Sequence, residues 1–110
     1  MSQAKTNLFD TDLQEMALIF KALGHPARLQ ILQFLARNKA CFSGDITEII
    51  PLGRTTINQH LLELKKAGLI KGVVQGVKTN YCLNETGIGK LKGKGVEFCS
   101  GLHSDEKCKC

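Results

Sequence analysis

Apolar residues recur at helical spacing in the first third of this chain. Between Leu8 and Leu23 they fall on one stripe and its immediate flank, which predicts a first helix that Asp10 or Asp12 caps. The stripe consists of Leu13, Ala17 and Phe20, with Met16, Ile19 and Leu23 beside it.

A second helix is predicted from Pro26 to about Arg37. Proline suits the first turn of a helix because the N–H that it lacks would have no partner there. The apolar residues of this helix are expected to point into the core: Leu29, Ile31, Leu32 and Leu35.

The next segment is predicted to contain a short strand at Ala40–Ser43 and a short helix from Asp45 to Ile50, which Pro51 ends. A tight turn leads into a longer helix over residues 54–67. Gly68 ends this helix, because glycine is the residue that most easily adopts the left-handed conformation found after helix C-termini.

The spacing then becomes typical of strands. Residues 69–75 and 79–84 are rich in Val, Thr and Tyr and flank a short basic tip, which predicts a β-hairpin over about 69–84. Residues 85–100 keep a helical apolar stripe but hold four glycines. Each glycine costs a helix roughly 0.5–1 kcal/mol relative to alanine, so we expect a weak helix that needs a partner surface.

The predicted fold is mostly α with a small β-hairpin. The order α-α-(β)-α-α-β-β-α is that of a winged helix-turn-helix. The 110 residues fit one domain, which we expect over residues 1–100, with a flexible, cysteine-containing tail over 101–110.

The fourth helix has one apolar and one polar face. Leu61 and Leu64 lie within about 40° of Ile57 around the helix axis, and the three residues form its buried stripe. His60 is expected to pack at the edge of that stripe. The other side carries short hydrogen-bonding residues and cations, which suit base edges and phosphates in a major groove. The predicted DNA contacts are Arg54, Thr55, Thr56, Asn58, Gln59, Lys65 and Lys66, with Gln75, Val77 and Lys78 at the hairpin tip.

The charge distribution agrees with a polyanionic partner. The chain has 15 Lys and Arg against 10 Asp and Glu, a formal net charge of +5. Residues 54–78 contain five basic residues and one acidic residue. A basic region confined to one part of a fold is typical of nucleic-acid binding, although a basic surface also serves solubility alone.

From Phe20 to Asn84 the sequence resembles the ArsR/SmtB family of bacterial metal- and stress-responsive repressors. The likeness rests on FKALGHPARLQILQFL (20–35), RTTINQHLLELKKAGLI (54–70) and YCLN (81–84). It implies a homodimer joined by the first and last helices, bound to operator DNA of dyad symmetry that an inducer releases. Asn58 stands where the family usually has Ser, which keeps the hydrogen-bonding capacity.

The usual sensor sites of this family are missing. Phe42 and Gly44 occupy the positions of its paired cysteines, and residues 85–98 contain no His or Asp for its zinc site. Cysteine is the ligand type that remains, which favours a soft, thiophilic inducer such as trivalent arsenic or antimony. No obligatory cofactor is expected.

The five cysteines suggest two groupings. Cys41 of the short strand is expected beside Cys82 of the second hairpin strand, and Cys99, Cys108 and Cys110 can form a three-sulfur site alone or across subunits. In the alternatives, Cys41 and Cys82 only fill core space and the tail thiols are incidental, or the tail cysteines bind zinc with His103.

The leading interpretation is a transcriptional repressor that releases DNA on binding a thiophilic metal or metalloid. The alternatives are the same repressor used as a thiol redox switch, and a winged-helix protein-interaction module without a DNA site. An enzyme is the poorest interpretation, because the three histidines show no grouping with a nucleophile. No apolar run reaches the roughly 18–20 residues of a membrane span and no signal peptide is evident, so we expect a cytoplasmic protein without a membrane partner.

Overall fold

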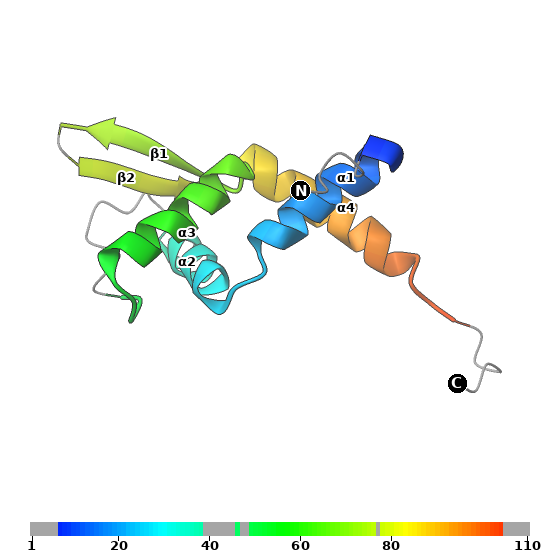
Figure 1. Cartoon of the computed structure of the whole chain (residues 1–110), viewed down its shortest axis with the longest axis horizontal. Helices are drawn as coiled ribbons and strands as arrows, with labels where there is room; N and C mark the ends of the chain where they lie inside the picture. The colour runs from blue at the N-terminus through cyan, green and yellow to red at the C-terminus, as the bar shows by residue number, and fades with distance from the viewer. Residues whose placement is uncertain (1–6, 39–45, 47–48, 77, 105–110) are drawn as a thin grey trace.

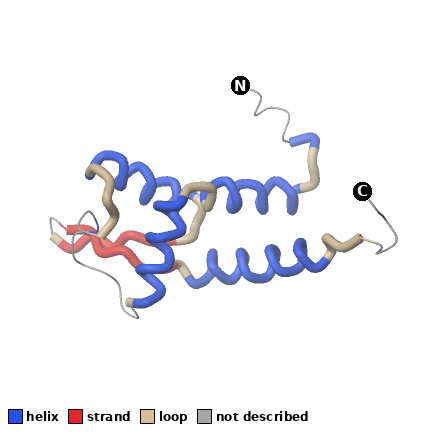
Figure 2. The backbone as a smooth tube through the Cα atoms, turned by 90° about the horizontal axis from the view of Figure 1, so that it is seen from below, coloured by secondary structure: helices blue, strands red, loops and turns tan. Residues whose placement is uncertain are grey.

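The computed structural model of the chain describes residues 7–38, 46, 49–76 and 78–104, without the side chains of Gln75 and Lys78. Its elements are α1 (Thr11–Ala22), α2 (Pro26–Arg37), α3 (Arg54–Lys66), β1 (Ile70–Gln75), β2 (Lys78–Leu83) and α4 (Glu85–Ser100). Helices α2 and α3 and the hairpin form one body, from which α1 and α4 extend together as an arm (Figure 1). The two arm helices run side by side in opposite directions (Figure 2). The predicted winged helix-turn-helix architecture is confirmed.

The core lies where α2, α3 and the base of the hairpin meet. Ile57, Leu61 and Leu64 of α3 are buried, as the helical spacing predicts, and they share one cluster with Ile31 and Leu35 of α2. Burying a side chain of this size contributes about 1.5–3 kcal/mol, so this cluster fixes which face of α3 remains outside.

The end of α3 follows from one glycine. Gly68 adopts a φ of +78°, its N–H donates to the carbonyl of Lys65 at 3.0 Å, and the N–H of Leu69 donates to that of Leu64 at 3.0 Å. This is the Schellman arrangement, which satisfies carbonyls at a helix end and turns the chain sharply. The turn carries the chain directly into β1.

The hairpin is antiparallel and pairs Gly72 with Tyr81. Strand β1 begins one residue later than predicted, and β2 keeps its predicted length but lies one residue earlier. The N–H of Leu69 still serves α3, and Asn84 belongs to α4, where its side chain accepts a hydrogen bond from the N–H of Thr86 at 3.2 Å. Gly76 turns the tip with a φ of +65°.

The predicted inward position of Leu29 is wrong: its side chain is 48% exposed. Leu29 precedes Ile31 by two residues, which places it about 160° away around the helix axis. The inward face of α2 instead follows the four-residue spacing of Ala27, Ile31 and Leu35.

The first helix also differs from its prediction. It begins at Thr11 with Asp10 at the N-cap, one of the two predicted cap positions, although the Asp10 side chain accepts no hydrogen bond there. Its buried residues are Met16, Ile19 and Ala22. The predicted stripe of Leu13, Ala17 and Phe20 is exposed instead. Helical spacing reveals that a helix has an apolar side, but not which partner surface covers it.

Helix α4 forms over 16 residues despite its glycines, although none of its residues, all of them described, is buried. Lys94 bridges α4 to α1 through Asp12 at 3.1 Å and Glu15 at 3.2 Å, and the ring of Phe98 lies edge-on to Phe20 at 6.2 Å. Exposed ion pairs contribute little each, so the arm of a single chain is held weakly.

One predicted element and part of another lie outside the described residues. These are the whole strand Ala40–Ser43, and Asp45, Thr47 and Glu48 of the short helix. Within the described part, Ile46 and Ile50 are buried and the N–H of Ile50 donates to the carbonyl of Ile46 at 3.2 Å. This hydrogen bond has the four-residue spacing of a helix and lies within the predicted element.

Candidate nucleic-acid interface

The outer face of α3 carries the short polar residues that the sequence assigned to base contacts. Thr55, Thr56, Asn58 and Gln59 are all exposed, while Ile57 between them is buried. All four bear an amide or a hydroxyl within about one and a half helical turns, which is the chemistry that reads base edges in a major groove. Leu62, on the same side, is 43% exposed.

Cations stand at both ends of this face. Arg54 begins the helix, and Lys65 and Lys66 occupy its last turn, exposed to solvent. The first turn contains no acidic residue, so no carboxylate offsets the partial positive charge of the helix N-terminus. Phosphates on both sides of a groove would therefore meet positive potential.

The hairpin lies beside α3 and forms the wing (Figure 1). Gln75 and Lys78 pair at its tip, but their side chains and the whole of Val77 lie outside the described residues. Lys71 of β1 is exposed and adds a cation to the wing. It was not among the DNA contacts predicted at the hairpin tip. The tip contacts predicted from the sequence remain predictions.

The inner side of α3 holds a polar cluster. His60 is 6% exposed, and its Nδ1 accepts a hydrogen bond from Nε of Arg28 at 3.0 Å. The ring of His25 lies 4.3 Å from that of His60. Burial lowers the pKa of His60 below its ordinary range, and the neighbouring His25 and Arg28 lower it further.

The predicted packing role of His60 agrees with this burial, but its partner was not foreseen. Arg28 and His60 lie 32 positions apart, and no local pattern links them. The only available signal was a histidine at the edge of an apolar stripe, which suggests a buried partner without naming it.

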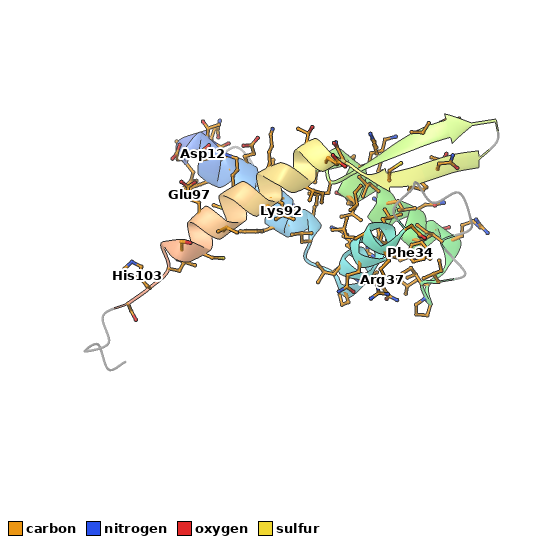
Figure 3. All side chains as sticks on the ribbon, turned by 180° about the vertical axis from the view of Figure 1, so that it is seen from behind. Asp12, Phe34, Arg37, Lys92, Glu97 and His103 are labelled. Carbon is orange, nitrogen blue, oxygen red and sulfur yellow. The ribbon has the colours of Figure 1, made fainter. Side chains whose placement is uncertain are left out.

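The cysteines are only partly placed. Cys82 lies on β2, is buried and is disulfide-bonded, whereas Cys99 near the end of α4 is exposed and free. Cys41, Cys108 and Cys110 lie outside the described residues. Within the described part of the chain, no three His, Cys, Asp or Glu side chains come together as metal ligands. His103 lies beyond the end of α4, at the far end of the arm from α2 and α3 (Figure 3).

Among the described residues, no helix is long and apolar enough to cross a membrane.

Known proteins with similar sequences are transcriptional regulators. A family model described as a helix-turn-helix domain matches residues 23–73. An HTH-type regulator of Methanocaldococcus jannaschii is 40% identical over 68 residues, which cover 62% of this chain and 76% of that protein. The cadmium resistance transcriptional regulatory protein CadC of Listeria innocua is 30% identical over 98 residues, covering 89% and 82%.

A solved structure shows the same fold. The homodimeric winged helix-turn-helix DNA-binding domain of a possible ArsR-family regulator from Mycobacterium bovis is 24% identical and superposes with a TM-score of 0.62. The match covers 96% of this chain and 97% of that one. The curated relatives, which are transcriptional regulators, confirm the prediction of a regulator rather than an enzyme.

Proposed function

This chain belongs to the ArsR/SmtB family of winged helix-turn-helix transcriptional regulators, and from that membership we propose that it represses transcription as a homodimer on operator DNA. Helix α3 would enter the major groove, with base contacts from Thr55, Thr56, Asn58 and Gln59. Arg54, Lys65 and Lys66 would hold phosphates, and Gln75 and Lys78 of the wing would reach the flanking backbone or minor groove.

One observation carries this proposal: the face of α3 that holds these four residues is open to solvent, and a buried apolar stripe fixes the opposite face. A surface helix without a ligand usually carries more Glu and Lys at such positions and fewer Thr, Asn and Gln. Because this buried stripe holds α3 in place, its exposed polar face (the reading face: Thr55, Thr56, Asn58 and Gln59) needs no rearrangement to meet DNA.

The arm supports the homodimer. Its exposed apolar side chains include Leu13, Leu18 and Phe20 on α1 and Val96 and Phe98 on α4. These side chains come from the two helices that lie side by side outside the body (Figure 2). An apolar surface of this kind marks a protein interface, and a second copy would cover it symmetrically.

Footprinting on DNA upstream of the gene tests the repressor. We expect two protected half-sites about 34 Å apart, one for each recognition helix of a dimer. Specific binding should persist at about 150 mM salt, where non-specific binding is weak, with a Kd of about 10⁻⁴–10⁻⁶ M. Binding without sequence preference that vanishes at this salt concentration would instead indicate a protein-interaction module.

We further propose that cysteine thiolates bind the inducer, a thiophilic metal or metalloid of the arsenite or antimonite type. The ligand set would come from Cys41 and Cys82, once the disulfide at Cys82 is reduced, or from Cys99, Cys108 and Cys110. The similarity to a cadmium resistance regulator supports a soft metal, since thiolates select such ions. A tenfold loss of operator affinity needs only about 1.4 kcal/mol of coupling.

A thiol redox switch is the second candidate, and the disulfide at Cys82 favours it. Two thiols at this site would be oxidised by a peroxide to a disulfide, with reduction of the peroxide to two molecules of water. Because Cys82 lies on β2 at the base of the wing, a bond made or broken there would move the wing relative to α3.

A pair of serine variants distinguishes these candidates. We expect arsenite to release reduced wild-type protein from its operator. The loss of operator affinity that arsenite causes should be at least tenfold smaller for the Cys41→Ser, Cys82→Ser double variant. The Cys99→Ser variant tests the other proposed ligand set, and it should respond like wild type if Cys41 and Cys82 bind the inducer. Release by peroxide with a loss of two titratable thiols, and no release by arsenite, would favour the redox switch. Equal release of wild type and double variant by both agents would exclude Cys41 and Cys82 from sensing.

A further inference from the structure

We propose that Arg28 and His60 are positioning residues of the recognition helix. The Arg28 side chain bridges α3 to the end of α1, and protonation of His60 breaks this link and weakens operator binding. The inference rests on the proposed DNA-binding function and adds to it a dependence on pH.

The geometry joins three helices through one guanidinium group. Arg28 Nε on α2 donates to His60 Nδ1 on α3 at 3.0 Å, and its Nη1 donates to the carbonyls of Ala22 at 3.2 Å and Lys21 at 3.4 Å on α1. His60 is the only buried polar or charged residue among those that the structure describes. An arginine fork holds several acceptors in a fixed plane, so the three helices keep one relative orientation.

The bond requires neutral imidazole. Arginine only donates and stays charged, so Nδ1 must accept and the single ring proton lies on Nε2. His60 Nε2 is buried without a hydrogen-bond partner in the described part of the chain. A second proton would go to Nδ1, where it would face the Arg28 donor and place two cations side by side.

The charged surroundings offer little compensation. Helix α2 contributes Arg28 and, at its N-terminus, His25, whose Nδ1 accepts from the N–H of Ala27 at 3.0 Å. Helix α3 contributes Glu63, which lines one groove with Arg28, and α1 contributes Lys21 to that groove. Lys71 of β1 lines a different groove, with Cys82.

The sign of the pH effect follows from this arrangement. Burial lowers the pKa of His60 in the folded protein, and the neighbouring His25 and Arg28 lower it further. The stabilisation by the Arg28 bond is complete above the ordinary histidine pKa of about 6.5 and is lost as the pH falls through the lowered value.

The hydrogen bonds of Arg28 affect DNA binding because they connect the arm, through the end of α1, to the helix that carries the reading face. His60 follows Gln59 directly, and α1 belongs to the proposed dimer arm. When the link breaks, α3 can shift relative to the arm, and the spacing of two recognition helices on a dyad operator changes. Ordinary protonation of surface histidines would act in the opposite sense, since added positive charge strengthens DNA binding.

The test is operator affinity as a function of pH. Wild-type protein first selects a duplex from random DNA, and fluorescence anisotropy then gives its Kd from pH 7.5 to 5.0, with circular dichroism verifying the fold at each pH. We expect wild-type affinity to fall about tenfold on acidification. His60→Gln keeps an acceptor for Arg28 and does not titrate, so its affinity should stay level. His103→Gln, at the far end of the arm, should fall like wild type.

Arg28→Met provides a second variant that lacks the link at every pH. Its affinity should already be reduced about tenfold at pH 7.5 and change little below it. A wild-type affinity that rises on acidification, or an equal fall in His60→Gln and wild type, would overturn the inference alone. Failure of the wild-type protein to select any duplex would overturn the proposed function, and the inference with it.

Discussion

Replacement of Asn58 and Gln59 together by alanine is expected to lower operator affinity by about a hundredfold. Each side chain that makes a good pair of hydrogen bonds to a base contributes about 1–3 kcal/mol of discrimination, and a tenfold change corresponds to about 1.4 kcal/mol. Both residues are exposed on α3, and alanine is the best helix former. The loss should therefore appear in specific binding and not in folding.

Three measurements make this result interpretable. Affinity for the selected duplex and for a scrambled duplex gives the specificity ratio, and thermal unfolding gives the stability. The Gln30→Ala, Gln33→Ala double variant is the matched control, because it removes two exposed amides from α2 in the same body. It should bind like wild type.

Lys66→Ala should behave differently from the reading-face variant. Loss of a lysine that contacts phosphate weakens binding to all sequences alike and lowers the salt dependence by about one ion.

If the Asn58→Ala, Gln59→Ala variant kept its specificity ratio, the outer face of α3 would not read the operator. The repressor would then need another reading surface.

Local rules were sufficient for the elements of the proposed DNA interface. The stripe of Ile57, Leu61 and Leu64 determines how α3 is rotated, and Gly68 determines where it ends. Both signals lie within a few residues of the feature that they predict. This is why the sequence alone placed Thr55 and Gln59 on the outer face correctly.

Features that depend on distant partners were not predictable in this way. The stripe on α1 has helical spacing, but the helix alone does not determine whether another surface covers it, and in the single chain it is exposed. The link between Arg28 and His60 joins residues 32 positions apart through one hydrogen bond. Periodicity describes one element at a time and carries no information on such pairs.

Gly87 shows the same limitation in the last helix, where all glycines look equally unfavourable from the sequence. A Cβ built at Gly87 overlaps the carbonyl oxygen of Gly68 and lies 2.6 Å from its carbonyl carbon, whereas one built at Gly89 meets no atom within 4 Å. The start of α4 thus lies directly on the turn that ends α3. A side chain at Gly87 would meet backbone, which no rotamer change can relieve.

Gly87→Ala is therefore expected to destabilise the protein by about 3 kcal/mol, since overpacking a close contact costs about 1–3 kcal/mol and occasionally more. Gly89→Ala should instead stabilise it by about 0.5–1 kcal/mol, because alanine loses less backbone entropy in a helix. Urea unfolding of both variants and wild type at one protein concentration measures these changes, since dimer formation makes stability depend on concentration. Equal stability of the two variants would mean that α4 can move off the α3–β1 turn at no cost. The arm would then be free to change its angle to the recognition helix, and neither Gly68 nor the Arg28 link could fix the distance between two reading faces.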